Sequence, residues 1–170
     1  MPYSYPKGKQ EVKEHFLRHI PLATNILDVG AGCGTYGNLL AAQYKKIDAI
    51  EIHEPNIKNF NLNAIYRKVY LGNILEFKHL PLYQYFILGD VLEHMTVVHA
   101  QRLLNTISKQ NGLCMVAVPF MYEQGRVDGN AYEEHLQPDL THEVFATRYP
   151  FMRPLFIYDN KYGYYINYSI

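Results

Sequence analysis

The sequence has few cysteines, no excess of either charge and no long apolar run. Its two cysteines, Cys33 and Cys114, form no CxxC pair, which fits a reducing compartment better than a disulfide framework. Lys plus Arg equals Asp plus Glu at 16 each, so net charge gives no support to a nucleic-acid partner. The longest apolar stretch, Leu113 to Tyr122, is too short to span a bilayer and contains Pro119.

The amino terminus also lacks the apolar core of a signal peptide, because Met1 to Gln10 mixes Tyr, Pro and Lys. We therefore expect a cytoplasmic protein with no membrane partner. The chain has 170 residues, of which 48% are hydrophobic, and this predicts one domain over 1–170 with its own core. Residues 1–9 are expected to form a flexible N-terminal segment. The sequence carries no signal for any particular oligomeric state.

Short apolar runs alternate with segments of helical spacing along most of the chain. The runs predicted to be strands are 25–29, 46–52, 68–71, 85–88 and 113–118. The segments predicted to be helices are 10–20, 36–44, 55–65, 97–110 and 138–149. Such alternation is typical of parallel strands joined by right-handed crossovers.

The carboxyl end departs from this alternation. Two strand-like runs, 155–159 and 164–168, are separated only by 160–163, so they predict a hairpin. A hairpin adds an antiparallel strand to an otherwise parallel sheet. The predicted fold is α/β: a doubly wound, mostly parallel seven-stranded sheet with an antiparallel C-terminal hairpin strand and helices on both faces.

A glycine-rich turn, Asp28-Val29-Gly30-Ala31-Gly32-Cys33-Gly34, follows the first predicted strand. Glycines let the backbone approach a ligand closely, and the amides that open the next helix attract a carboxylate. We therefore expect a ligand carboxylate to lie beside Gly30, Ala31, Gly32 and Gly34. Asp28 is expected close enough to attract an ammonium group of the same ligand.

Polar residues also end the second and third predicted strands. Glu51, followed by Ile52, suits hydrogen bonds from both hydroxyls of a ribose. Asn73 offers a donor and an acceptor to an adenine edge, and Ile74 would cover the ring, although Gly-Asn is equally common turn chemistry. Open α/β sheets bind ligands at the carboxyl ends of their strands, so these residues predict one nucleoside site.

The fourth strand leads into Gly89-Asp90-Val91-Leu92-Glu93-His94, which places Gly89, Asp90 and His94 beside that site. Glu93 and His94 equally fit a role as caps of the next helix. The segment 119–137 is long and polar, and we interpret it as an active-site lid. Within it, Tyr132 or His135 is expected to orient a bound substrate or to deprotonate its reacting atom. The alternative is that the segment is a passive surface loop.

We expect no metal. His94, Glu133, Glu134 and His135 match no zinc-binding spacing, and the acidic pair fits a solvated surface equally well.

Three of these motifs resemble those of the class I (Rossmann-like) S-adenosylmethionine-dependent methyltransferases. The run Leu27-Asp28-Val29-Gly30-Ala31-Gly32-Cys33-Gly34 is similar to motif I, and Ala49-Ile50-Glu51 is similar to the acidic end of the second strand. Asp90-Val91-Leu92-Glu93-His94 resembles the DVLEH run of members that act on small molecules. Asn73 departs from the family, where many members carry Asp.

The resemblance implies S-adenosyl-L-methionine as cofactor, S-adenosyl-L-homocysteine as product and a small-molecule acceptor. Because the sulfonium already activates the methyl group, we expect an in-line displacement that depends mainly on alignment. The candidate catalytic residues are His135, His94, Asp90 and Tyr132.

Two other functions fit parts of the sequence. Gly32-Cys33-Gly34-Thr35-Tyr36-Gly37 satisfies the GxGxxG pattern of NAD-binding proteins, with Glu51 as the ribose contact. However, dinucleotide folds usually continue with parallel strands rather than a closing hairpin. A non-catalytic domain that keeps the cofactor site and serves as a partner is the other alternative.

Overall fold

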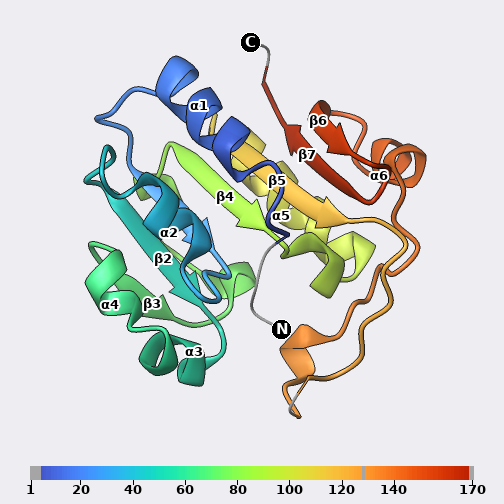
Figure 1. Cartoon of the computed structure of the whole chain (residues 1–170), viewed down its shortest axis with the longest axis horizontal. Coiled ribbons are helices and arrows are strands. Elements are labelled where there is room, and N and C mark those ends of the chain that lie inside the picture. The colour runs from blue at the N-terminus through green and yellow to red at the C-terminus, as the bar shows by residue number, and fades with distance from the viewer. Residues whose placement is uncertain (1–4, 128, 169–170) are drawn as a thin grey trace.

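The computed structural model describes residues 5–127 and 129–168. Within them, seven strands form one twisted sheet in the order β3-β2-β1-β4-β5-β7-β6 (Figure 1). The strands are β1 Ile26–Val29, β2 Ile47–Glu51, β3 Val69–Leu71, β4 Tyr85–Gly89, β5 Leu113–Pro119, β6 Arg153–Tyr158 and β7 Tyr162–Ile166. Neighbours from β3 to β5 are parallel, whereas β7 is antiparallel to both β5 and β6. The predicted fold class is confirmed.

Helices cover both faces of this sheet, with α1 and α2 in front of it in Figure 1 and α5 behind it. The α-helices of the described residues are α1 Lys9–His19, α2 Thr35–Leu40, α3 Glu54–Asn59, α4 Leu62–Ile65, α5 Val97–Lys109 and α6 His142–Arg148. Short 3-10 turns occur at η1 Ile74–Glu76, η2 Leu80–Leu82, η3 Leu92–His94 and η4 Ala131–Glu133. None of the helices in the described part of the chain has the length and apolar character needed to cross a membrane.

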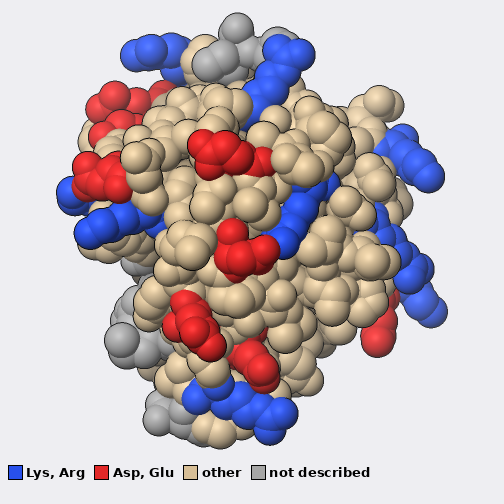
Figure 2. Space-filling model, turned by 90° about the vertical axis from the view of Figure 1, so that its right-hand side faces the viewer, with Lys and Arg blue, Asp and Glu red and all other residues tan. Residues whose placement is uncertain are grey.

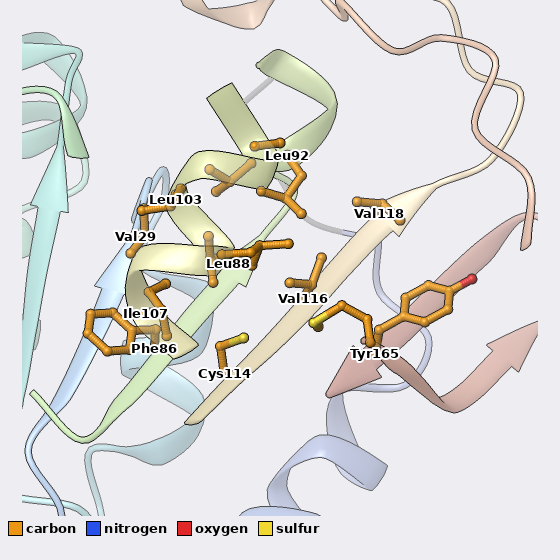
Figure 3. Close-up of a cluster of buried hydrophobic side chains, with 14 of the residues drawn as sticks. Val29, Phe86, Leu88, Leu92, Leu103, Ile107, Cys114, Val116, Val118 and Tyr165 are labelled. Atoms are coloured by element: carbon orange, nitrogen blue, oxygen red, sulfur yellow. The ribbon is translucent and has the colours of Figure 1, made fainter. Parts of the chain in front are cut away.

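The core consists of two layers because successive strand residues point to opposite faces of the sheet. On β4, Phe86 and Leu88 pack with Leu103 of α5 on one face (Figure 3). Tyr85 and Ile87 alternate with them and pack against α1 and α2 on the other face. Both layers are buried, which explains why the central strands appear in the sequence as continuous apolar runs.

The helix predicted over 55–65 is wrong, because the structure divides it into α3 and α4. The division lies at Asn61, whose φ of 48° is left-handed. Asn is one of the few residues other than Gly that adopts this conformation readily, and a single such residue interrupts a helix. The helix predicted over 138–149 likewise begins only at His142, because the Thr141 side chain accepts a hydrogen bond from the Val144 N–H and caps it there.

The terminal hairpin has a tighter turn than the sequence predicted. Asp159 and Asn160 both have φ of 50°, and the Lys161 N–H donates to the Tyr158 carbonyl at 2.8 Å. Two successive left-handed residues form a type I′ turn, whose twist matches that of the strands it joins. Gly163, predicted to lie in the turn, therefore belongs to β7.

The described part of the N-terminal segment contacts this hairpin. The Tyr5 ring stacks on Tyr162 with centroids 4.9 Å apart, and Lys7 forms an ion pair with Asp159. Residues 1–4 lie outside the described residues, so the expectation of a flexible segment stays a prediction.

The face of the molecule that carries the hairpin has side chains of both charges. Figure 2 shows Lys and Arg interspersed with Asp and Glu among uncharged residues, without a broad area of one sign. This agrees with the balanced composition of the chain.

We predict that shortening a side chain to alanine lowers the stability of the protein much more on the buried face of α5 than on its exposed face. Leu104 is fully buried, so Leu104→Ala leaves a cavity and should lower the free energy of unfolding by about 2–5 kcal/mol. Val98, on the same helix, is 70% exposed, and Val98→Ala should change it by less than about 0.5 kcal/mol. Urea titration measures both, and equal losses would contradict the placement of α5.

Candidate active site

A cavity of about 380 Å³ lies at the carboxyl ends of β1, β2, β3 and β4. Open α/β sheets bind ligands at this edge, where the strand order reverses. Nine of the predicted cofactor residues line it: Gly30, Ala31, Gly32, Glu51, Ile52, Asn73, Ile74, Gly89 and Asp90. The fold thus brings together the ends of four strands that are far apart in the sequence.

Two predicted cofactor residues, Asp28 and Gly34, lie outside this lining. Gly34 precedes α2 with a φ of 78°, and a Cβ there would lie 2.7 Å from the Ile65 side chain. Its N–H donates to the carbonyl of Ala31 at 2.8 Å, so that amide closes the turn. Gly34 therefore stabilises the glycine-rich turn on the side that packs against Ile65.

Asp28 is buried beneath the turn. The hydroxyl of Tyr66 donates a hydrogen bond to its carboxyl group, and Tyr66 also accepts one from the Gly37 N–H. Burial raises the Asp28 pKa to about 7, although the Tyr66 hydrogen bond and the Lys9 charge act in the opposite direction. The Asp28 carboxyl group thus lies beneath the turn, where it accepts hydrogen bonds from the Tyr66 hydroxyl and from the backbone N–H of Gly37.

The carboxylate of Glu51 joins the ends of β1 and β2. Its Oε2 accepts the Gly32 N–H at 2.8 Å, and its Oε1 accepts the His53 N–H at 2.8 Å. Each carboxylate oxygen can accept a further hydrogen bond. Glu51 is therefore fixed in orientation and retains acceptor capacity where it lines the cavity.

Asn73 begins η1 at the end of β3. Its Oδ1 accepts the N–H of Leu75 at 2.9 Å, so the side chain caps the turn as well as lining the cavity. Ile74 beside it is buried. Asn73 thus combines the turn chemistry and the cavity position that the sequence left as alternatives.

Sequence reasoning missed a cluster of tyrosines around Lys9. The Lys9 Nζ donates to the hydroxyls of Tyr36 at 2.9 Å and Tyr164 at 3.0 Å, and the hydroxyl of Tyr162 donates to Asp90 Oδ1 at 2.6 Å. Burial lowers the Lys9 pKa to about 8, and the charge of Asp90 partly opposes this. These residues are spread along the chain from Lys9 to Tyr164, so no local motif could have revealed them.

The same cluster explains Gly89 at the end of β4. A Cβ on Gly89 would lie 2.0 Å from Cε2 of the Tyr36 ring, so only glycine fits. Asp90 follows in the left-handed region with φ of 57°, which directs the chain toward η3.

The segment after β5 supplies the outer wall of the cavity. Tyr132 lines the cavity and is 54% exposed, whereas His135 lies just outside the lining and contacts the His94 ring at a centroid distance of 4.7 Å. Burial lowers the His94 pKa to about 4 and also lowers the pKa of His135. Both imidazoles are therefore neutral near pH 7 and each has one nitrogen lone pair.

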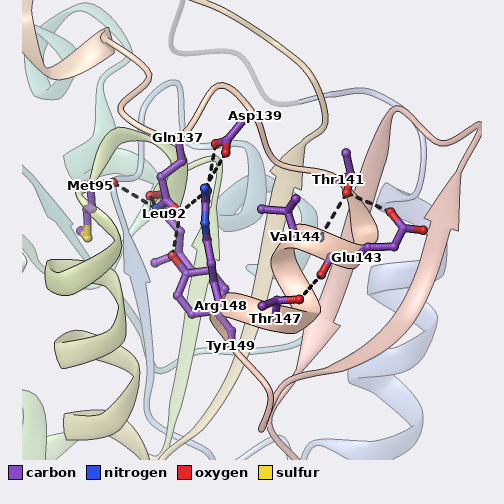
Figure 4. Close-up of polar contacts among 10 residues, drawn as sticks. All are labelled: Leu92, Met95, Gln137, Asp139, Thr141, Glu143, Val144, Thr147, Arg148 and Tyr149. Atoms are coloured by element: carbon purple, nitrogen blue, oxygen red, sulfur yellow. Dashed lines mark hydrogen bonds and ion pairs between the residues drawn. The ribbon is translucent and has the colours of Figure 1, made fainter.

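Gln137 attaches this segment to η3 (Figure 4). Its Nε2 donates to the carbonyls of Leu92 at 2.7 Å and Met95 at 3.1 Å. Its Oε1 accepts the Tyr149 hydroxyl at 2.9 Å and an Arg148 N–H at 3.2 Å. All these groups belong to distant parts of the chain, so Gln137 was not recognisable from the sequence.

Comparisons with known proteins agree with this architecture. A structure from Clostridium acetobutylicum, described as an S-adenosylmethionine-dependent methyltransferase, aligns with a TM-score of 0.69 at 10% identity, over 96% of this chain and 91% of that one. The chain has the class I methyltransferase fold. A Burkholderia thailandensis 1,6-didemethyltoxoflavin-N1-methyltransferase, solved with S-adenosylhomocysteine, aligns with a TM-score of 0.65 at 15% identity, over 94% of this chain and 76% of that one.

One sequence relative is also named as a methyltransferase. The chain is 28% identical over 159 residues to a ubiquinone biosynthesis O-methyltransferase of Rickettsia akari. The match covers 88% of this chain and 61% of the relative, so the chain spans about three fifths of that protein's length. No family model matches the sequence.

We predict that Asp28 makes stability depend on pH. Its pKa is about 7 in the folded chain and near 3.8 when unfolded, so the folded state holds the proton longer and stability falls as pH rises from about 4 to 7. Asp28→Asn should remove this fall, which is at most about 1.4 kcal/mol per pH unit. Urea unfolding at several pH values measures it, and the exposed Asp159→Asn variant should keep it.

We predict that Gln137→Leu destabilises the chain by at least about 2 kcal/mol. The substitution leaves the buried hydroxyl of Tyr149 without its acceptor, which costs roughly 1–3 kcal/mol. It also removes the Gln137 hydrogen bond to the Leu92 carbonyl, which still accepts the Met95 N–H, at a cost of about 0.5–1.5 kcal/mol. Gln10→Leu, at an exposed position on α1, is the control and should have little effect. Thermal unfolding distinguishes the two variants, and equal melting temperatures would contradict this role.

Proposed function

We propose that this chain is an S-adenosylmethionine-dependent methyltransferase that transfers a methyl group to a small-molecule acceptor. The observation that carries the proposal is the convergence of Gly32, Glu51, Asn73 and Asp90 on one cavity in the methyltransferase fold. A pocket of about 380 Å³ is within the size range of cofactor sites.

The nucleoside end of the cofactor is assigned to β2 and β3. Glu51 would accept hydrogen bonds from the ribose hydroxyls with the acceptor capacity that Gly32 and His53 leave free. Asn73 would contact the adenine edge, and Ile74 would pack on the ring. The amino-acid end would then lie along the backbone of Gly30 to Gly32.

The reactive methyl group is assigned to the side of the cavity lined by Asp90, His94 and Tyr132. The acceptor atom forms a bond to the methyl carbon while the carbon–sulfur bond breaks and its electron pair stays on sulfur. If the acceptor is a hydroxyl, its proton must leave as well. His94 is neutral near pH 7, so its lone pair can accept that proton.

Alignment is the main contribution of the protein to this reaction. Holding acceptor, methyl carbon and sulfur in line removes roughly 7–11 kcal/mol of the barrier at best. The segment 119–137 would act as the lid that excludes water from the cavity, with Tyr132 and His135 orienting the acceptor.

The class of acceptor is supported by two further observations. The curated relative carries the name of an O-methyltransferase of ubiquinone biosynthesis, and a structural neighbour is named for methylating a small heterocycle. Asp90, Val91 and His94 of the DVLEH run line the acceptor side in this proposal. Both observations favour a small molecule.

We predict that S-adenosyl-L-homocysteine binds the chain in calorimetry with one site and that Glu51→Gln weakens it by about 10- to 100-fold. Hydrogen bonds to a charged group contribute about 1.5–3 kcal/mol, and each 1.4 kcal/mol is tenfold. Glu54→Gln, an exposed position on α3, is the matched control and should bind as the wild type does.

Binding of NAD without S-adenosyl-L-homocysteine would overturn the proposal in favour of a dinucleotide-binding protein. Binding of S-adenosyl-L-homocysteine without labelled methyl transfer to any small-molecule fraction of a cell extract would instead favour a non-catalytic domain.

A further inference from the structure

The polar groups of Glu93, His94 and His135 meet next to the cavity, where the proposed function gives them no joint role. One ligand-type atom from each residue lies within 4.8 Å of the other two. Glu93 and His94 belong to η3, whereas His135 comes from the segment after β5. Two imidazoles and one carboxylate are a set that divalent transition metals bind.

The hydrogen bonds of both histidines leave the same nitrogen available. Nδ1 of His94 lies 3.2 Å from the Glu134 carbonyl, and Nδ1 of His135 lies 2.8 Å from the Tyr122 carbonyl. A carbonyl only accepts, so each Nδ1 carries the proton and each Nε2 carries the lone pair. Metal-binding histidines are usually oriented in this way by a backbone carbonyl or a carboxylate.

Glu93 is the independent observation that points to a ligand. Its side chain is 1% exposed, and neither carboxyl oxygen has a hydrogen-bond partner among the described residues. Burying a polar group without a partner is unfavourable, so such a group calls for an explanation, and a bound ion is one. A cation bound beside His94 and His135 would satisfy both oxygens.

Backbone hydrogen bonds fix the positions of the three residues relative to one another. The carbonyl of Glu93 accepts the N–H of Leu136 at 2.7 Å and that of Gln137 at 3.1 Å. The N–H of His135 donates to the Gln124 carbonyl at 2.8 Å, and the Gln137 side chain holds the same segment to η3. The cluster therefore forms when the lid segment docks against η3.

We propose that Glu93, His94 and His135 bind one divalent transition-metal ion, for which Zn²⁺ is the probe. Bonds from Zn²⁺ to nitrogen and oxygen are about 2.0–2.2 Å long, so the ion would draw the three atoms closer than they lie in the structure. Three protein ligands leave a coordination position open, as in catalytic zinc sites. Mg²⁺ prefers oxygen ligands and is expected to bind more weakly.

The position of His94 gives the ion a role that rests on the proposed function. His94 lines the cavity, so the open coordination position would lie toward the acceptor side. A metal there would bind a hydroxyl oxygen of the acceptor and lower its pKa, which would make that oxygen the methylated atom. Because the Nε2 lone pair of His94 would then hold the ion, His94 would not accept the hydroxyl proton, and that proton would pass to water.

The test is calorimetry of Zn²⁺ with the full chain after treatment with a chelator, together with the visible absorption of Co²⁺ bound to the same site. The wild type should bind one Zn²⁺ and give Co²⁺ bands typical of nitrogen and oxygen ligands. Glu93→Gln and His135→Ala should each weaken Zn²⁺ by at least about 10-fold. His99→Ala, which removes a cavity-lining histidine outside the cluster, should leave the affinity for Zn²⁺ unchanged.

Circular dichroism of each variant shows whether it is folded, and His135→Gln replaces His135→Ala if the latter is not. Equal Zn²⁺ affinities of the wild type and the folded Glu93 and His135 variants would overturn the site. S-adenosyl-L-homocysteine is titrated into the wild type in parallel. If the wild type binds Zn²⁺ but not S-adenosyl-L-homocysteine, the proposed function is contradicted and the metal site is still supported.

Discussion

The two hydrogen bonds of the Glu51 carboxylate determine the shape of the cavity edge. By accepting the N–H groups of Gly32 and His53, this one buried side chain joins the turn after β1 to the turn after β2. Hydrogen bonds to an ionised group are stronger than neutral ones, so the two turns hold their relative positions. The remaining edge of the cavity follows, because β3 and β4 flank β2 and β1 in parallel.

A second polar clamp connects the opposite wall of the cavity to the sheet. The Gln137 side chain makes four hydrogen bonds within the protein and is nearly inaccessible to solvent, so its segment docks against η3 in one arrangement. That docking sets His135 beside His94 and Glu93. The proposed acceptor side and the inferred metal site therefore depend on the same contact, whereas the proposed nucleoside side depends on Glu51.

The sequence was informative wherever local chemistry and position along the chain coincide. The turn from Gly30 to Gly34 and the residues Glu51 and Asn73 each follow an apolar run, and parallel strands place such ends at one edge. The break at Asn61 was not predictable, because a left-handed asparagine in a helical pattern depends on how α3 and α4 pack. Asp28 was predicted to attract an ammonium group of the ligand. The structure buries its carboxyl group against Tyr66, and the contact with a ligand stays a prediction.

The sequence by itself determined the order of strands and helices along the chain, the terminal hairpin and the strand ends that line the cavity. Tertiary structure alone decided the surroundings of Lys9, the clamp at Gln137 and the meeting of Glu93 with His135. The physical reason is range: periodicity and turn chemistry act between neighbours in the chain. The hydrogen bonds between residues 9 and 164 and between residues 92 and 137 can form only once the strands have paired and the helices have packed on the sheet.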